Sequence, residues 1–138
     1  IIPIGVADIP KKGTDVTIVS FNKMMKVALE AADLLEKENI SAEVIDLRTI
    51  RPMDYNTIIN SVKKTNRLVV VEETWPFCGI STEIAYNVQR HAFDYLDAPI
   101  KRVSQADTPL PFATQLIEES LPNAERVINA VKSVLYLN

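Results

Sequence analysis

Short runs of β-branched residues alternate with longer amphipathic segments along this chain, and this alternation restricts its possible folds more than any other feature. The runs cover residues 16–20, 43–47, 67–72 and 100–103. The first three alternate only weakly between apolar and polar side chains, which is typical of strands that are covered on both faces. The pattern therefore predicts a largely parallel sheet between two layers of helices.

Apolar residues recur with a helical period between these runs. Asp54 is expected to cap one helix, with Met53 packing against Ile58, and Asn123 is expected to begin the last helix after Pro122. The expected inward-facing positions are Met24, Val27, Ala28, Ala31, Leu34 and Leu35, then Ile58 and Val62, then Ile80, Ile84, Ala85, Val88 and Ala92, and finally Val127, Ile128, Val131, Val134 and Leu135. Strands and helices at this spacing form βαβ units, whose crossovers are almost always right-handed. We predict a three-layer α/β/α fold.

The amino-terminal residues add one more predicted strand. Ile2, Ile4 and Val6 alternate with less apolar residues and predict a less buried edge strand. The residues at 10–13, Pro-Lys-Lys-Gly, predict a turn after that strand. No repeat or low-complexity tract divides the chain, so residues 1–138 are predicted to form one domain.

Charge and composition exclude several classes of partner. The 138 residues have a net charge of −3, which offers no basic excess for nucleic acid or an acidic membrane surface. No apolar run approaches the roughly 20 residues that span a bilayer. A single cysteine cannot form an internal disulfide, which favours a reducing, intracellular compartment. Because the chain begins with IIPIG and no methionine, we expect it to be a fragment of a longer polypeptide.

The stretch RLVVVEETWPFCG, residues 67–79, resembles an active site because acids and the only cysteine follow a buried strand. Glu72 and Glu73 are adjacent on an extended segment, however, so they should point to opposite sides. Cys78 and His91 are predicted at opposite ends of one helix, too far apart for a nucleophile and its base. With three glycines, the chain has no GxGxxG or P-loop pattern, and one His with one Cys is too few for zinc. We predict no catalytic, cofactor-binding or metal-binding residue in this domain.

A second interpretation of the same stretch is a protein–protein interface. Trp75, Pro76 and Phe77 place aromatic area on a loop, and aromatic residues are enriched in the cores of interfaces. The alternative is that Trp75 and Phe77 fold back onto the domain's own core. We predict a partner-facing loop, with Arg51, Pro52 and Met53 as neighbours from the next strand-end loop.

Several segments together resemble a known family. They are TDVTIVSFNKMMKVALEAADLL, AEVIDLRTIRPMD, SVKKTNRLVVVEETWPFCGISTEI, FDYLDAPIKRVSQADTPLPFA and ESLP, in this order. The chain from about residue 13 onward is similar to the carboxy-terminal domain of the beta subunits of the pyruvate dehydrogenase first component, within the wider transketolase C-terminal-domain-like superfamily. RTIRPMD and VEETWP resemble the pyruvate enzymes more than the branched-chain ones.

This resemblance implies a fold and a role. The fold is a mixed five-stranded sheet in the order 1-3-2-4-5 with the first strand antiparallel. The enzyme is a heterotetramer of alpha and beta subunits that decarboxylates pyruvate with thiamine diphosphate and magnesium. Both cofactors would bind to parts absent here, the amino-terminal pyrimidine-binding half of the beta subunit and the alpha subunit. The isolated domain is therefore expected to be inactive, without thiamine diphosphate affinity.

The resemblance also implies partners. The domain would contact the alpha subunit and the second beta subunit, and it would help to dock the subunit-binding domain of dihydrolipoyl acetyltransferase. The family's docking positions correspond to Asp97 and to the chain end, Leu137 and Asn138. The implied location is the bacterial cytoplasm or the mitochondrial matrix.

Two departures and two alternatives remain. Relatives usually carry glycine where this chain has Thr74 and Gln105, which predicts altered loops because glycine serves positive φ. The chain could instead belong to a related 2-oxo acid dehydrogenase or transketolase-like enzyme. It could also be a stand-alone domain that binds a small ligand at the strand ends, around Glu72, Thr49 and Asn22.

Overall fold

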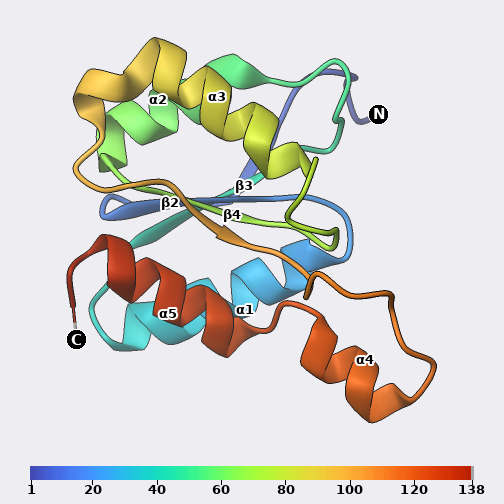
Figure 1. Cartoon of the computed structure of the whole chain (residues 1–138). Helices are drawn as coiled ribbons and strands as arrows, with labels where there is room; N and C mark the ends of the chain where they lie inside the picture. The colour runs from blue at the N-terminus through green and yellow to red at the C-terminus, as the bar shows by residue number, and fades with distance from the viewer. Residues whose placement is uncertain (138) are drawn as a thin grey trace.

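The computed structural model describes residues 1–137, which form one five-stranded sheet between two pairs of helices. The strands are β1 (Asp8–Lys11), β2 (Val16–Ser20), β3 (Ala42–Asp46), β4 (Leu68–Val71) and β5 (Lys101–Val103). The helices are α1 (Met24–Lys37), α2 (Tyr55–Thr65), α3 (Ile80–Ala92), α4 (Thr114–Ser120) and α5 (Ala124–Val134), and a 3-10 turn, η1, covers Phe93–Tyr95. Helices α2 and α3 cover one face of the sheet and α1 and α5 the other (Figure 1).

The sheet has the order β1-β3-β2-β4-β5, with β1 antiparallel to β3 and the remaining pairs parallel. This is the predicted three-layer α/β/α fold with the predicted strand order. The four predicted parallel strands are confirmed, each within one residue at either end. The edge strand is displaced, because it covers Asp8–Lys11 and not residues 2–6, whereas Ile2 and Ile4 are exposed.

Long-range partners explain this displacement. Arg48, just beyond β3, forms an ion pair of 2.7 Å with Asp8, and Asp8 lies opposite Asp46 in the register. The expected turn at residues 10–13 therefore begins too early, since Pro10 and Lys11 belong to the strand. Proline is tolerated there because β1 pairs on one side only and Pro10 lies at the sheet edge.

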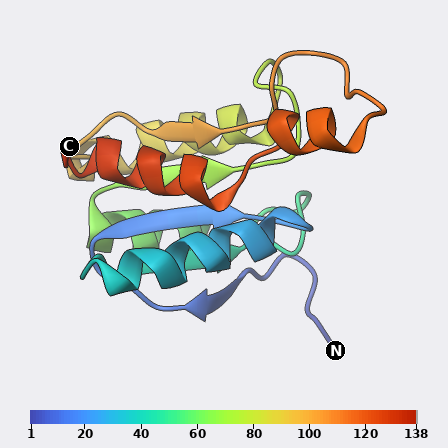
Figure 2. The same ribbon diagram turned by 90° about the horizontal axis from the view of Figure 1, so that it is seen from below.

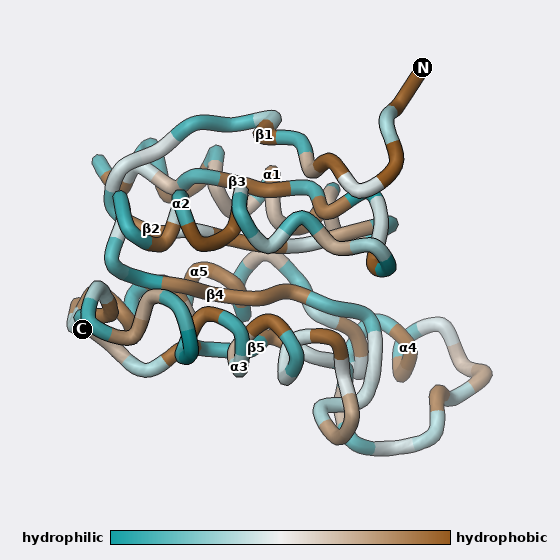
Figure 3. The backbone as a smooth tube through the Cα atoms, turned by 90° about the horizontal axis from the view of Figure 1, so that it is seen from above, coloured by the Kyte–Doolittle hydropathy of each residue, from teal (hydrophilic) through white to brown (hydrophobic). Residues whose placement is uncertain are grey.

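The core lies in two apolar layers. Successive residues of a buried strand point to opposite faces, so Ile18 belongs to the layer under α1 and α5, and Val19 to the layer under α2 and α3. Ala28, Ala31 and Leu35 of α1 are fully buried in the first layer. The prediction that Leu34 faces inward is wrong, because Leu34 lies at the margin of the apolar stripe and is exposed. The apolar residues of the central strands form the brown band through the middle of Figure 3. Both faces are covered, which explains the weak alternation in the strand sequences.

Two predicted helix caps are confirmed. The side chain of Asp54 accepts a hydrogen bond from Thr57 N at 3.1 Å, and that of Asn123 accepts one from Arg126 N at 2.9 Å. Helix α4 was not predicted. It lies beyond the carboxyl end of β5, outside the two helix layers (Figures 1 and 2). Within residues 1–137, no helix combines the length and the apolar character that crossing a bilayer requires.

Candidate functional site

Glu72 at the end of β4 is a structural carboxylate. Its side chain is fully buried and accepts hydrogen bonds from Ser81 N at 3.0 Å, from Ser81 Oγ, and from Ser104 Oγ at 3.3 Å. Ser81 lies in the first turn of α3, where backbone N–H groups lack helical partners and favour a negative charge. Glu72 thus joins β4 to the start of α3 and to the residue after β5.

The residues around Glu72 leave no room for a substrate. A Cβ atom on Gly79 would lie 2.5 Å from Glu72 Oε1, so the carboxylate packs directly against the backbone that begins α3. The neighbouring Glu73 is exposed on the other side of the chain, with Lys23 Nζ at 4.0 Å. The two acids therefore do not converge on one point, as an acid–base pair would need to do.

The loop that follows, residues 73–78, exposes aromatic area. Trp75 is 51% exposed and Phe77 is 81% exposed, so neither folds back into the core. Three hydrogen bonds hold the loop: Trp75 Nε1 donates to Thr108 O at 2.9 Å, Arg102 Nη1 to Pro76 O at 2.7 Å, and Gln105 N to Thr74 O at 3.1 Å. The aromatic side chains are therefore presented from a loop that is tied to its neighbour.

Thr74 and Gln105, for which the family resemblance predicted altered loops, belong to this same connection. Neither has a positive φ, and the backbone of Gln105 donates to that of Thr74. Cys78 does have a positive φ, 57°, immediately before α3. It is exposed, and among the described residues it forms no disulfide.

Arg51, Pro52 and Met53 lie on a separate loop after β3. Thr49 Oγ1 donates to Pro52 O at 2.8 Å and accepts from Gly5 N at 3.0 Å, and Asp54 Oδ2 accepts from Ala7 N at 3.0 Å. This loop is therefore joined to the amino-terminal segment, whereas the Trp75 loop is joined to residues 105–108. Both loops lie at the carboxyl ends of the strands, and Tyr55 OH links the helices after them by donating to Glu83 Oε1 at 3.1 Å.

Asp54 shows how this loop is held. Burial by itself would raise the pKa of Asp54, but hydrogen bonds from Thr57 and Ala7 outweigh it, and the pKa is lowered below its ordinary value. The charged carboxylate therefore begins α2 and holds the incoming chain at once. Arg51 and Pro52 are exposed and Met53 packs against the core.

Asp97 lies at the other end of the sheet, beside the amino end of β4. Asp97 N donates to Asn66 O at 2.9 Å, and Tyr136 OH donates to Asp97 O at 3.2 Å. Arg67 bonds through Nε to Val134 O at 3.0 Å, and its Nη2 lies 3.7 Å from Asp97 Oδ2. The Asp97 carboxylate stays more than half exposed. The fold thus brings Asp97 together with the carboxy-terminal residues.

Leu137 is exposed, and its backbone N donates to Lys132 O at 2.9 Å. The third predicted docking residue, Asn138, lies outside the described residues. His91 is exposed in the last turn of α3, at the opposite end of that helix from Cys78. Within residues 1–137, no group of three or more His, Cys, Asp or Glu side chains could hold a metal ion.

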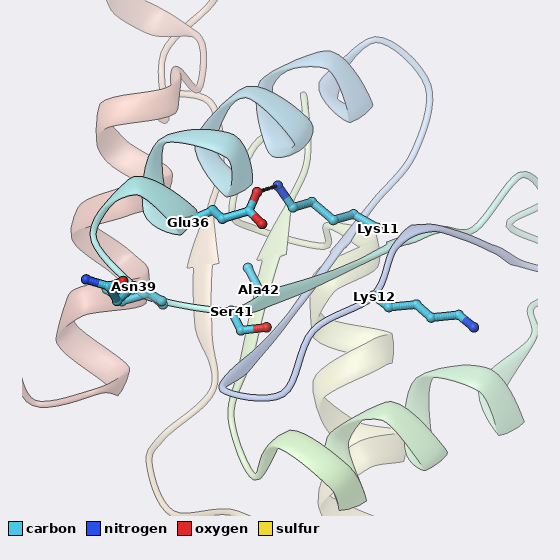
Figure 4. Close-up of a pocket in the computed structure, with 7 residues that line it drawn as sticks. Lys11, Lys12, Glu36, Asn39, Ser41 and Ala42 are labelled. Carbon is cyan, nitrogen blue, oxygen red and sulfur yellow. Dashed lines mark hydrogen bonds and ion pairs between the residues drawn. The ribbon is translucent and has the colours of Figure 1, made fainter.

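The hollows of the surface do not assemble the alternative ligand site. Asn22 lines a hollow of about 480 Å³ with Phe21, Lys23, Met24 and Glu73, but neither Glu72 nor Thr49 lines it. A second hollow of about 270 Å³ lies between β1 and the end of α1 (Figure 4). There Lys11 is paired with Asp33 at 2.6 Å and Glu36 at 2.8 Å, so its charge is already balanced. The hydrogen bonds to Asp33 and Glu36 raise the pKa of Lys11.

Glu43 is a second buried carboxylate, between β3 and α2. It is paired with Lys64 and accepts a hydrogen bond from Ser61 Oγ at 2.6 Å. Burial alone would raise the pKa of Glu43, but the hydrogen bonds from Lys64, Ser61 and Gly13 lower it. Like Glu72, this acid joins a helix to the sheet. The hydrogen-bond donors to Glu43 and to Glu72 were not predicted from the sequence, because they do not lie next to these acids along the chain.

Comparisons with known proteins identify the family to which this chain is similar. The family model "Transketolase, C-terminal domain" matches residues 5–127. The "Pyruvate dehydrogenase E1 component subunit beta" of Rickettsia felis is 57% identical over 98% of this chain and 41% of that protein. The mitochondrial protein of the same name from Dictyostelium discoideum is 51% identical over 100% of this chain and 39% of that protein. The chain thus spans about two fifths of the curated relatives it matches.

Solved structures show the same fold. A chain described as "Split gene transketolase, inactive beta4 tetramer" matches with a TM-score of 0.85 and 31% sequence identity, over 99% of this chain and 43% of that one. A 2-oxoglutarate:ferredoxin oxidoreductase from Magnetococcus marinus matches with a TM-score of 0.61 and 14% identity, over 94% of this chain and 19% of that one. At that identity the second match concerns the fold alone.

Proposed function

This chain belongs to the transketolase C-terminal domain family, and from that premise we propose that it is the assembly and docking domain of a pyruvate dehydrogenase beta subunit. The complete enzyme would decarboxylate pyruvate oxidatively and pass acetyl groups to lipoyl domains. Identities of 50–57% to pyruvate dehydrogenase beta subunits support this choice of enzyme. As a domain inside an enzyme, it would contribute contacts and no reacting group.

The observation that carries the proposal is the exposed loop at the carboxyl end of β4. Trp75 and Phe77 leave large aromatic faces uncovered, although hydrogen bonds with Thr108, Arg102 and Gln105 hold the loop in place. A loop held in this way loses little conformational freedom when a partner covers it. We propose that the alpha subunit or the second beta subunit of a heterotetramer covers this loop, with Arg51, Pro52 and Met53 at the margin of the contact.

The cofactors of such an enzyme would bind elsewhere. Thiamine diphosphate needs a diphosphate site with a divalent cation, and in the described residues no metal-holding group exists. The buried acid at the strand end, Glu72, already accepts three hydrogen bonds within the domain. The residues present do not fit the cofactor, so we assign this chain neither thiamine diphosphate nor magnesium.

The second part of the proposal is docking at the opposite end. Asp97, Leu137 and Asn138 would receive the subunit-binding domain of the dihydrolipoyl acetyltransferase. The contact of Tyr136 with Asp97 supports this grouping, because it joins the two parts of the chain that the family resemblance assigns to docking. An exposed carboxylate on a short stiff connection suits a cationic partner, since little backbone must be immobilised.

Assembly can be tested in the complete heterotetramer by replacing Trp75 with alanine. We expect the free energy of assembly to weaken by about 2 kcal/mol, because a central aromatic at an interface is a typical hot spot. The midpoint of dissociation should move to a higher protein concentration accordingly. Mass photometry across a dilution series measures this midpoint. Leu34→Ala is the matched control, since Leu34 is an exposed apolar side chain on α1, away from the loop. A Trp75→Ala midpoint equal to that of the wild type would refute the interface.

A further inference from the structure

A row of buried hydroxyl groups connects helix α2 to the sheet. Thr17 of β2 and Glu43 of β3 are partners in the parallel register, so their side chains point to the same face. Ser61 and Thr65 are one helical turn apart on α2 and therefore share one face of that helix. All four residues are at most 3% exposed. The helix and the sheet are thus joined by polar groups inside a mainly apolar layer.

Four contacts arrange these groups in one line. Ser61 Oγ lies 2.6 Å from Glu43 Oε1, and Thr17 Oγ1 lies 2.7 Å from Ser61 Oγ. Thr65 Oγ1 lies 2.7 Å from Thr17 Oγ1 and 3.2 Å from Arg67 O. We name the hydroxyl groups of Thr65, Thr17 and Ser61 the hydroxyl chain. Three hydroxyl groups have three protons, so one of the four contacts has no proton when Glu43 is ionised.

The distances decide which contact has no proton. An O–H···O hydrogen bond spans about 2.5–3.0 Å. The three contacts nearest to Glu43 fall in that range, whereas the contact between Thr65 and Arg67 O is longer. Arg67 O already accepts a hydrogen bond from Thr17 N at 2.9 Å, so it is satisfied without Thr65. Ser61 therefore donates to Glu43, Thr17 donates to Ser61, and Thr65 donates to Thr17.

Lys64 keeps Glu43 charged. Its ammonium group pairs with Glu43 Oε2, and Gly13 N donates to the same oxygen at 3.3 Å. Burial raises the pKa of Glu43, but the hydrogen bonds from Lys64, Ser61 and Gly13 together lower it. The other neighbours are Thr17 of β2, Ile9 of β1, and Thr57 and Asn60 of α2, which with Ser61 and Lys64 line a hollow of about 320 Å³ or pair with β3. Lys64 is the one charged side chain among these neighbours.

We propose that the charge of Glu43 sets the direction of the hydroxyl chain and that Lys64 maintains this direction, so that removing the charge of Lys64 lets Glu43 take up a proton and reverses the chain. The proton would lie on Oε1, because Oε2 accepts from Gly13 N. Glu43 would then donate to Ser61, Ser61 to Thr17, and Thr17 to Thr65. Thr65 would donate to Arg67 O. Four protons then serve all four contacts.

The reversal would connect the surface with a distant polar cluster. The Lys64 side chain is 47% exposed and the Glu43 side chain 2%, so an event at the surface changes a buried charge. At the far end of the chain, Arg67 O gains a second donor, and the Arg67 guanidinium bonds to Val134 O and lies 3.7 Å from Asp97. Neither Lys64 nor the hydroxyl chain belongs to the subunit contacts proposed above, so the reversal is tested independently of them.

Nuclear magnetic resonance of the 138-residue chain tests the direction. Nuclear Overhauser effects from the buried hydroxyl protons report which neighbour each proton faces. In the wild type at neutral pH, the Thr65 proton should face Thr17 and not Arg67 O. In Glu43→Gln at the same pH, the side-chain amide should donate to Ser61, because Lys64 and Gly13 N require an acceptor at the other position, and the Thr65 proton should turn to Arg67 O. A Thr65 proton that faces Arg67 O in the wild type overturns the proposal, whatever the variants show.

Lys64→Met tests the role of the lysine. Without its ammonium group, Glu43 should take up a proton at a proton concentration at least about tenfold lower than in the wild type, because burial is then less opposed. The carboxyl carbon resonance of Glu43 measures this titration, and the Thr65 proton should turn in the same pH range. Lys63→Met is the control on the neighbouring position, where the ammonium lies 5.2 Å from the Tyr95 ring centre, and it should change neither. An unchanged titration in Lys64→Met, or a titration without reversal of the Thr65 proton, overturns the proposal.

Discussion

The two ends of strand β4 present different kinds of surface. At its carboxyl end, Glu72 is buried and satisfied while Trp75 and Phe77 expose aromatic area. At its amino end, Arg67 and Asp97 form a polar cluster with the carboxy-terminal residues, and the Asp97 carboxylate stays exposed. Apolar surfaces suit permanent subunit contacts, whereas exposed charges give contacts that salt weakens and that exchange more readily. If both surfaces bind partners as proposed, one small domain offers a lasting interface and a reversible one.

The largest expected effect concerns the buried acid that holds the carboxyl end. Glu72→Ala should lower the free energy of unfolding by about 3 kcal/mol, because it leaves the donors on Ser81 and Ser104 without an acceptor and opens a cavity. Urea unfolding of the chain measures this loss. Glu73→Ala is the adjacent control and should change stability by no more than about 0.5 kcal/mol. Similar losses for both residues would mean that the two acids do not differ as the structure indicates.

A smaller effect is expected at the neighbouring loop. Asp54→Ala should cost about 1 kcal/mol at neutral pH, since it removes the cap of α2 and the acceptor for Ala7 N. The folded-state pKa of Asp54 is lowered, so its contribution is complete above the ordinary carboxyl pKa and disappears as the pH falls through the folded-state value.

The difference between the wild type and Asp54→Ala should therefore be constant near neutrality and shrink below about pH 4. Urea unfolding at a series of pH values gives this curve. Asn56→Ala, an exposed residue in the first turn of α2, is the control for helix composition. A difference that grows on acidification would contradict the direction of the pKa shift.

The smallest effect is expected at the amino end. Asp97→Asn in the assembled heterotetramer should weaken binding of the acetyltransferase subunit-binding domain by about 0.5 kcal/mol at low salt, as is typical of an exposed charge pair. The loss should diminish as salt increases. Surface plasmon resonance at two ionic strengths measures it, with Asp94→Asn as an exposed control three residues earlier in the chain. Equal affinities for Asp97→Asn and the wild type at low salt would reject docking through Asp97.

This last result also tests the comparison between the two ends. If the carboxyl end is an apolar interface and the amino end an electrostatic one, salt should reduce the effect of Asp97→Asn and leave that of Trp75→Ala nearly unchanged. The same salt response at both ends would remove the distinction. Opposite responses would sharpen it into two separate modes of contact.

The sequence by itself determined the elements whose signals are local. Covered strands, helical periods and the caps at Asp54 and Asn123 depend on residues within a few positions of each other, so periodicity and cap chemistry were sufficient to predict them. The opposite directions of Glu72 and Glu73 followed in the same way from strand geometry. The strand order, by contrast, was implied by the family resemblance and not by any of these local patterns.

Only the tertiary structure decided how distant residues meet. Glu72 is a structural acid because Ser81 and Ser104 converge on it, and Asp97 belongs with the chain end because Tyr136 reaches it from 39 positions away. The edge strand lies at Asp8–Lys11 because its hydrogen bonds and ion pair are made with β3 and Arg48. Helix α4 was missed because none of its residues is buried, and without a covered face a short helix leaves no strong period in the sequence. Hydrogen bonds and charges depend on where a partner lies in space, which the spacing of residues along the chain does not specify.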